Sequence, residues 1–397
     1  MKVLLLTTGS RGDIQPFIAL ACALNTDGHQ VTLRAPTSAT PLAESYGVRV
    51  APFGDDWSEI LADPDTRAAF ETGGRGFRGR ALDTRSAPRL YREIRRAYSK
   101  MAWDADESLD FDLVVHQAFV PGHRIAGEMG VPAVPVCLQP MWVPTRSFPN
   151  PSTTFPVPRE LNRASYLATE LRVRTLSGRW RDPDSLVLQA FSRHLLPGSA
   201  DYPESVHTTG FWFVPESAPP ADLRKFVAAG EPPVCVTLGS SAEQPGVRQV
   251  VADAVRLTGL RTVVVDGSTG TDSAGRVLHV GHAPFDWLLP RVAAVVHHGG
   301  SGTTGAALAA GRPQIVRPSL TEQNFFAQRV HALGVAPAPR PLGQLSAGEL
   351  ARAVVETVND REMAARAGEW RGLIRAEGGV AEAVRALESV HCAFRRA

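Results

Sequence analysis

The chain has 397 residues, 44% hydrophobic and 21% charged, which is typical of a globular protein but too many residues for one ordinary hydrophobic core. Its 42 basic and 40 acidic side chains give a net charge of +2 with no long basic run. Nucleic acid is therefore excluded as a predicted partner, because binding to a phosphate backbone needs clustered Lys and Arg.

The cysteines predict a reducing compartment. Cys22, Cys137 and Cys235 lie in apolar stretches typical of buried thiols, and Cys392 stands apart near the end. No CxxC pair or other metal-ligand spacing occurs, so we expect no metal. The apolar start is too short for a signal peptide, and no run approaches the ~18 apolar residues of a membrane span. We therefore predict a cytoplasmic protein without a transmembrane segment.

The first part of the chain predicts a parallel sheet. A strand at 3–6, a helix at 14–24 and a strand at 31–33 form a βαβ unit. Further buried strands are predicted at 113–115 and 133–138. Residues 140–158 contain too many prolines for a helix, and such long irregular segments are often binding loops.

The same alternation starts again at Val234, after a Pro- and Ser-rich stretch. The later strands are predicted at 262–265, 278–280, 293–297 and 314–316, and the last helices at 346–359, 361–375 and 380–394. We therefore predict an α/β protein with an N-terminal domain at 1–205, a linker at 206–222 and a C-terminal domain at 223–397.

The junction between the strand at 293–297 and the next helix predicts a phosphate site. Residues 298–304 are glycines and hydroxyl residues after one histidine, and they open a helix. The first N–H groups of a helix lack intrahelical partners and carry its positive dipole end, and glycines let a phosphate come close. His297, at the strand's carboxyl end, adds an imidazole donor. The alternative is a tight structural turn with His298 packed against a neighbour.

Residues 300–305 also match the GxGxxG fingerprint of dinucleotide-binding proteins. Glu322 lies near the spacing of an acidic ribose ligand, but it stands several residues beyond the strand end. The fingerprint alone is a weak signal, and it keeps an NAD(P)-dependent oxidoreductase as an alternative function.

Several longer motifs resemble one family. Residues 297–304, with 310–318 and 322–324, resemble the nucleotide-sugar signature of the glycosyltransferase superfamily that includes plant secondary-metabolite, bacterial antibiotic and sterol enzymes. Residues 9–13 with Pro16 are similar to the bacterial natural-product and sterol branch. The resemblance implies the GT-B fold, in which two Rossmann-like domains face a central cleft and no metal is required. The last helix resembles one that crosses back onto the N-terminal domain, although it could equally pack on its own domain.

The resemblance also implies roles for individual residues. It makes Asp13 the general base and places Ser10, Arg11, Ser240, His297, Ser301, Gly302 and Thr303 at the donor diphosphate, Glu322 and Gln323 at the sugar hydroxyls, Val280 and His282 at the nucleoside, and Trp142 and Phe148 at the acceptor. Asp13 and Glu322 could instead cap the helices that they begin, and Arg11 could be a plain surface side chain. Glu322 stands where many relatives have Asp, which leaves the sugar open.

The predicted function is inverting, metal-independent transfer of a sugar from a UDP- or dTDP-sugar to a hydroxyl of a hydrophobic natural-product or sterol-like acceptor. The predicted partners are thus a nucleotide-sugar donor and a small hydrophobic acceptor. Besides the oxidoreductase, a non-catalytic nucleotide-sugar-binding protein is an alternative.

Overall fold

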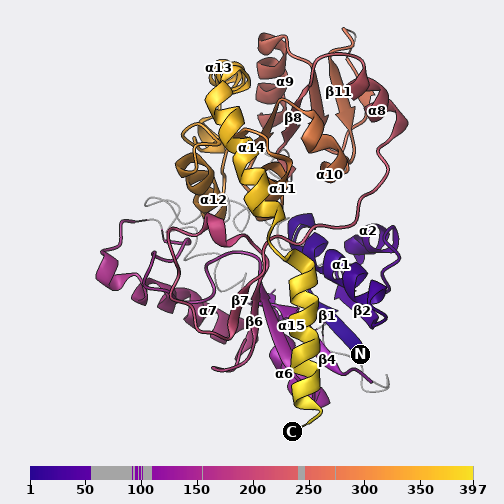
Figure 1. The fold of residues 1–397 in the computed structure, drawn as a ribbon, viewed down its shortest axis with the longest axis vertical. Helices are drawn as coiled ribbons and strands as arrows, with labels where there is room; N and C mark the ends of the chain where they lie inside the picture. The colour runs from indigo at the N-terminus through magenta and orange to yellow at the C-terminus, as the bar shows by residue number, and fades with distance from the viewer. Residues whose placement is uncertain are drawn as a thin grey trace. The chain divides into compact units, whose positions relative to one another are not determined.

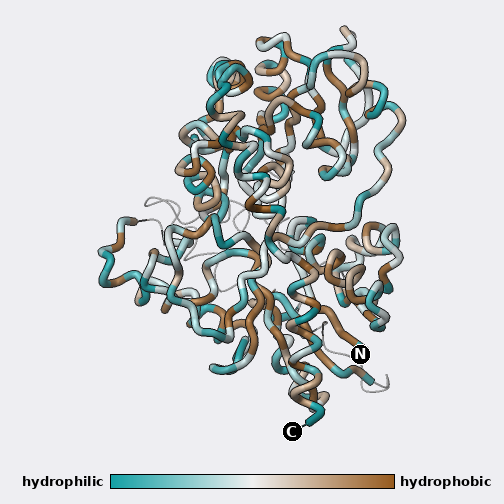
Figure 2. Tube along the Cα trace, viewed as in Figure 1, coloured by the Kyte–Doolittle hydropathy of each residue, from teal (hydrophilic) through white to brown (hydrophobic). Residues whose placement is uncertain are grey.

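The computed structural model describes residues 1–54, 92, 94–96, 98, 99, 101, 110–153, 155–239, 246–272 and 274–396. The chain forms two compact units, which are residues 1–215 with 377–397 (unit 1) and residues 216–376 (unit 2). Each is a parallel-dominated sheet covered by helices (Figure 1). The strands of unit 1 are hydrophobic over much of their length, as expected for strands buried on both faces (Figure 2).

Unit 1 contains a parallel sheet in the order β3-β2-β1-β4-β5-β6-β7. Its strands are β1 (Lys2–Leu6), β2 (Gln30–Ala35), β3 (Val50–Pro52), β4 (Leu113–Gln117), β5 (Ala133–Cys137), β6 (Val187–Gln189) and β7 (Val206–Thr208). Its α-helices include α1 (Arg11–Thr26), α2 (Thr40–Glu44), α6 (Gly122–Met129), α7 (Leu167–Ser177) and α15 (Gly379–Phe394). The strand order reverses between β1 and β4, and this switch point is where open α/β sheets usually bind ligands.

Helix α1 forms because its apolar residues fall on one face. Phe17, Ala21 and Leu24 are buried against the sheet, in the spacing expected of an amphipathic helix. Helix α15, from the end of the chain, packs beside α1 and adds Ala383, Val384 and Leu387 to the same core (Figure 1). The final helix therefore belongs to unit 1, although its sequence follows unit 2.

Unit 2 has a sheet in the order β10-β11-β9-β8-β12-β13, in which only the β10–β11 pair is antiparallel among the described strands. Its strands are β8 (Val234–Thr237), β9 (Thr262–Val265), β10 (Gly270–Thr271), β11 (Val277–Val280), β12 (Ala294–His297) and β13 (Gln314–Val316). Its α-helices include α8 (Ala221–Ala228), α9 (Val247–Thr258), α10 (Phe285–Leu288), α11 (Ser301–Ala310), α12 (Thr321–Ala332), α13 (Ala347–Asn359) and α14 (Arg361–Arg375). The strand order reverses between β8 and β12.

The predicted strands and helices occur within a few residues of their expected bounds, whereas β3, β6, β7 and β10 were not predicted. Cys137 and Cys235 are buried as expected, while Cys22 is half-buried and Cys392 is exposed. All four thiols are free. None of the helices in the described ranges is long and apolar enough to cross a membrane.

Candidate functional site

In unit 1, the site residues gather where β1 and β4 end. Gly9, with a φ of +114°, turns the chain out of β1, and Ser10 is the N-cap of α1. Asp13 follows at the third helical position. Ser10 and not Asp13 is thus the N-cap, but the alternative that Asp13 caps the helix is confirmed, because Asp13 is the third residue of a capping box. Its Oδ2 accepts from the Ser10 N–H and from the Ser10 Oγ, each at 2.9 Å.

The other carboxylate oxygen of Asp13 is held from β4. Gln117, the last residue of that strand, donates from Nε2 to Asp13 Oδ1 at 3.1 Å. Asp13 is half-buried, and burial raises the pKa of its carboxyl, against the opposing effect of the bonds from Ser10 and Gln117. The carboxyl therefore has two properties of a general base, a fixed orientation and a raised pKa. Ser10 and Arg11 lie exposed beside it, in the first turn of the same helix.

In unit 2, the amino end of α11 provides unpaired backbone donors. Gly300 is the N-cap, and the first intrahelical bond runs from the Thr304 N–H to the Gly300 carbonyl at 3.0 Å. The N–H groups of Ser301, Gly302 and Thr303 thus precede the hydrogen-bonded ladder. Ser301 and Thr303 are half-buried and Gly302 is exposed, so these donors are accessible to an anion.

His297 lies at the predicted place, but its ring is occupied within the fold. Its side chain is 0% exposed, its Nδ1 accepts from the Gly299 N–H at 3.1 Å, and its Nε2 lies 2.8 Å from Gln314 Oε1. Because Nδ1 accepts, Nε2 carries the proton and donates to Gln314. Burial lowers the pKa of His297 to about 3, so the ring is neutral. A direct bond from this ring to a phosphate would replace one of these contacts, so the predicted role of His297 at the diphosphate stays a prediction.

The neighbouring His298 lies between two glycine-containing turns, the one after β8 at Gly239 and the one after β12 at Gly300. A Cβ on Gly239 would stand 3.1 Å from its Cε1, and a Cβ on Gly300 would stand 2.6 Å from its Nε2. Burial lowers the pKa of His298 to about 4, and its Nδ1 has no hydrogen bond of normal geometry to the described residues. The ring therefore adjoins both glycine turns and keeps unused hydrogen-bonding capacity.

Gly299 joins this turn to the residues expected at the sugar. Its φ is +92°, and a Cβ there would lie 2.7 Å from the backbone oxygen of Gln323. The side chain of Gln323 is buried, and its Oε1 accepts from the Ser319 N–H at 2.9 Å and from the Leu320 N–H at 3.1 Å. Glu322 lies half-buried in the first turn of α12, where Leu320 rather than Glu322 is the N-cap.

The remaining predicted site residues differ from one another in how exposed they are. Val280 is buried at the end of β11, and His282 is exposed two residues later. Ser240 lies outside the described residues. Trp142 is half-buried against Phe119, with ring centroids 5.6 Å apart, whereas Phe148 is 3% exposed and packs inside the fold. A ring so enclosed has little surface left for a ligand, whereas Trp142 keeps part of its surface accessible.

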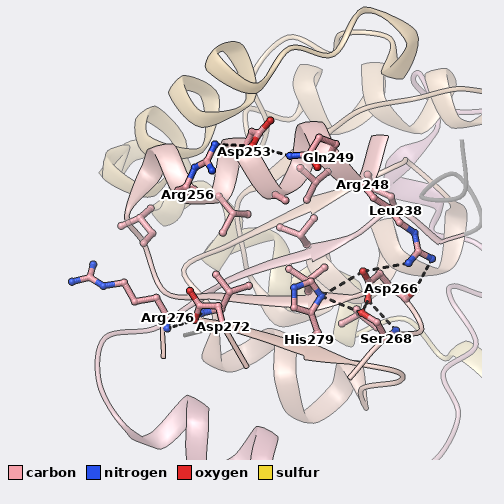
Figure 3. A pocket seen from close by; sticks show the side chains of 18 of the residues that line it. Leu238, Arg248, Gln249, Asp253, Arg256, Asp266, Ser268, Asp272, Arg276 and His279 are labelled. Atoms are coloured by element: carbon pink, nitrogen blue, oxygen red, sulfur yellow. Dashed lines mark hydrogen bonds and ion pairs between the residues drawn. The ribbon is translucent and has the colours of Figure 1, made fainter. Parts of the chain in front are cut away.

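A separate cavity of about 650 Å³ lies between α9 and strands β9 and β11. Val251 and Val264 are among the residues that line it, and Arg248 and His279 face Asp266 at 4.0 and 3.5 Å (Figure 3). These charged groups pair with one another, and none of the predicted site residues lines the cavity. In the described part of the chain, no group of three or more His, Cys, Asp or Glu could hold a metal.

Comparisons with known proteins identify the family. Residues 3–129 match the model of the glycosyltransferase family 28 N-terminal domain, and residues 262–390 that of the erythromycin biosynthesis protein CIII-like C-terminal domain. The O-mycaminosyltylonolide 6-deoxyallosyltransferase of Streptomyces fradiae is 34% identical over 98% of this chain and 97% of its own length. A sterol 3-beta-glucosyltransferase of Saccharomyces cerevisiae is 29% identical over 96% of this chain, which spans only 34% of that relative.

Solved structures show the same fold. The glycosyltransferase VinC in complex with dTDP has a TM-score of 0.66 and 21% identity, covering 98% of this chain and 99% of that one. The glycosyltransferase SsfS6 of a Streptomyces species, complexed with thymidine diphosphate, has a TM-score of 0.63 and 21% identity, with coverage of 98% and 99%.

Fold, switch-point residues and relatives define a nucleotide-sugar-dependent transferase with the GT-B architecture. The chain belongs to the glycosyltransferase family that contains the Streptomyces fradiae deoxyallosyltransferase. The oxidoreductase and the non-catalytic binding protein, both considered from the sequence, are therefore wrong.

Gln117 and its hydrogen bond to Asp13 were not predicted from the sequence. The phosphate contact was also assigned to His297 rather than His298 without knowledge of the contacts of either ring. The signal for Gln117 was available in part, because a polar His-Gln pair directly follows the predicted buried strand at 113–115. Nothing in the sequence showed that this side chain would meet a helix 104 residues earlier.

Proposed function

We propose that this protein is an inverting, metal-independent glycosyltransferase that moves a sugar from a dTDP- or UDP-sugar to a hydroxyl of a hydrophobic natural-product or sterol-like acceptor. The observation that carries the proposal is the oriented carboxylate of Asp13 at the switch point of unit 1. A carboxylate in that setting is suited to take a proton from an alcohol.

The reaction is a single displacement. The acceptor hydroxyl gives its proton to the Asp13 carboxylate as its oxygen attacks the anomeric carbon. The bond from that carbon to the diphosphate breaks on the opposite side, and its electron pair leaves with the nucleoside diphosphate. Attack opposite the leaving group inverts the anomeric configuration.

Unit 2 is proposed to hold the donor, and unit 1 the acceptor. The N–H groups of Ser301, Gly302 and Thr303 would stabilise the charge that develops on the leaving diphosphate, a task that needs no cation when preorganised donors are present. His298 would contribute through its ring, and His297 would support the turn from behind.

The other proposed contacts rest on the resemblance of the sequence motifs. Glu322 and Gln323 would bind sugar hydroxyls, Val280 and His282 the nucleoside, and Ser10, Arg11 and Ser240 the diphosphate. Bound dTDP in two solved structural neighbours makes dTDP the first donor nucleotide to test. The relatives named for O-mycaminosyltylonolide and for sterols support a hydrophobic acceptor, and we propose Trp142 as a contact. The free thiols support the proposed cytoplasmic location.

A mass-spectrometric screen of dTDP- and UDP-sugars against macrolide, polyketide and sterol aglycones tests the proposal directly. For an active pair, proton NMR of the product gives the anomeric configuration, and assays with excess EDTA test independence from metal. Retention of configuration, or loss of turnover in EDTA, would refute the corresponding part of the proposal.

The role of Asp13 is tested with Asp13→Asn, which keeps the shape of the side chain and removes its basicity. We expect kcat to fall by about 100-fold or more, while calorimetric affinity for dTDP stays unchanged. Asp27→Asn, at the exposed other end of α1, is the matched control and should leave turnover intact. Equal activity of the two variants would remove Asp13 from the chemistry.

A further inference from the structure

The environment of Gln117 fixes which way its amide points. Gln117 is 1% exposed, and its Oε1 accepts from the Thr7 Oγ1 at 2.9 Å and from the Thr8 N–H at 3.3 Å. With the amide reversed, an NH₂ group would face the Thr8 N–H, and two donors would oppose each other. Nε2 must therefore face Asp13, and the contact at 3.1 Å is a donor to the carboxylate.

The hydrogen bonds to Asp13 leave its two oxygens unequal. A carboxylate offers about four acceptor sites, roughly two on each oxygen. Oδ2 uses its sites for the N–H and the hydroxyl of Ser10, both at 2.9 Å. Oδ1 receives Gln117 alone among the described residues, so it keeps one site for another proton.

We propose that Gln117 is the positioning residue of the general base, presenting Asp13 Oδ1, rather than Oδ2, to the acceptor hydroxyl. This inference depends on the proposed function, because it assumes that Asp13 is the base. In the transfer step, the hydroxyl proton moves to Oδ1 as the acceptor oxygen bonds to the anomeric carbon. Thr7 and Thr8, at the end of β1, act through Gln117 by fixing its amide.

A neutral amide suits this task better than a charged partner. A cation beside Asp13 would orient the carboxylate but would lower its pKa and weaken it as a base. A second carboxylate would accept rather than donate, and the two groups would have to share a proton. The amide orients Oδ1, lowers the pKa of Asp13 less than a full positive charge at the same place would, and shares no proton with it.

Among the described residues, few titratable groups lie around this pair. On α1, Arg11 is exposed two residues before Asp13. On β4, His116 precedes Gln117, and burial lowers its pKa to about 4, so it is neutral. On α6, His123 pairs with Asp182 at 2.9 Å. The described charged side chains do not shift the pKa of Asp13, which responds to burial, Ser10 and Gln117.

Gln117→Glu tests the hydrogen bond that the Gln117 Nε2 donates to Asp13, because it removes that donor and keeps the acceptor oxygen. The glutamate keeps an acceptor for Thr7 and Thr8 but turns an oxygen toward Asp13 Oδ1. We expect the apparent pKa of the resulting carboxyl pair to rise by at least about 1 unit. The acid limb of the pH profile of kcat/KM should move up by the same amount, with an unchanged KM for the nucleotide-sugar.

The pKa is measured without any substrate by carbon-13 NMR titration of protein labelled at the aspartate side-chain carboxyls. The Asp13 signal is assigned by its absence in Asp13→Asn. Gln15→Glu is the matched control, since it adds the same charge on α1, two residues from Asp13, without taking the place of its hydrogen-bond donor. We expect its effect to be several-fold smaller. Thermal unfolding checks that each variant is folded.

An unchanged Asp13 titration in folded Gln117→Glu overturns the positioning role. Gln117→Met is the second variant, because it adds no charge and removes the same donor; it should also raise the pKa of Asp13. If Asp13→Asn keeps full turnover while the titration shifts as expected, the proposed base is wrong but the hydrogen-bond assignment stands. The two failures are therefore distinguishable.

Discussion

Gly299 offers a sharp test of how the donor site is built. It lies between β12 and α11 with a φ of +92°, and a Cβ there would stand 2.7 Å from the Gln323 backbone oxygen and 3.0 Å from Val316 Cγ1. Ordinary contact begins at 3.4 Å, so Gly299→Ala must push the Gln323 carbonyl away by about 0.7 Å, the difference between 3.4 and 2.7 Å. The carbonyl belongs to the first turn of α12, which cannot move alone.

Two costs add in this variant. A side chain in the left-handed region costs about 1–2 kcal/mol, and overpacking a filled site costs about 1–3 kcal/mol more. We therefore expect unit 2 to lose about 2–5 kcal/mol of unfolding free energy. Because misplacement of a binding group by about 1 Å can cost about 100-fold, kcat/KM for the donor should fall by about that factor.

Gly259→Ala is the matched control in the same unit. Gly259 has a φ of +63°, and the nearest atom to a Cβ there is Arg276 Nη1 at 3.9 Å, an ordinary contact. It should cost only about 1–2 kcal/mol and leave kcat/KM unchanged. Urea unfolding and steady-state kinetics are measured on both variants. If Gly299→Ala behaves like Gly259→Ala in both assays, the close approach to Gln323 does not shape the donor site.

Three further predictions concern histidine and the last helix. His298→Phe should weaken calorimetric affinity for dTDP by about 10-fold or more, the effect of one lost bond to a charged group, and unchanged affinity would contradict its assigned place. Burial lowers the pKa values of His297, His298 and His116 to about 3, 4 and 4, below the unfolded value of 6.5. As the pH falls, the unfolded chain therefore binds these protons before the folded one does. The free energy of unfolding should be at its full value above pH 6.5 and fall toward pH 4, by at most about 1.4 kcal/mol per pH unit for each ring. An unfolding free energy in urea that stays constant from pH 7 to 5 would refute this. Deleting residues 377–397 exposes the core around Leu387 and should unfold unit 1, whereas native-like circular dichroism of unit 1 would show that the helix is dispensable.

The fold was largely predictable because its signals are local. Buried parallel strands give short apolar runs such as 293–297, and glycine turns mark the ends where they meet helices. The edge strand β3 and the short β6, β7 and β10 escaped because two to three residues carry too little pattern. The sequence left open whether α15 packs on unit 1 or unit 2, because the apolar face of an amphipathic helix can cover either hydrophobic core.

The sequence predicted the turns at which the candidate site residues lie, but not the contacts of their side chains. Glycine content and strand order predict the turn at residues 298–303, and the structure has a helix start there, at Ser301. The His297 imidazole is hydrogen-bonded within the fold because Gln314 lies on the neighbouring strand. The orientation of the Asp13 carboxylate depends in the same way on Gln117. These partners come together only through tertiary packing, and motif spacing holds no information about them.

The passage of the chain through unit 2 before its return to unit 1 sets an order for biosynthesis. Residues 216–376 form one continuous stretch, whereas the core of unit 1 needs Ala383, Val384 and Leu387. Residues 1–215 therefore leave the ribosome first but cannot complete their core until residues 383–387 are made. Unit 2 is complete by residue 376, so a translational pause between residues 376 and 383 leaves the core of unit 1 incomplete while unit 2 can already fold.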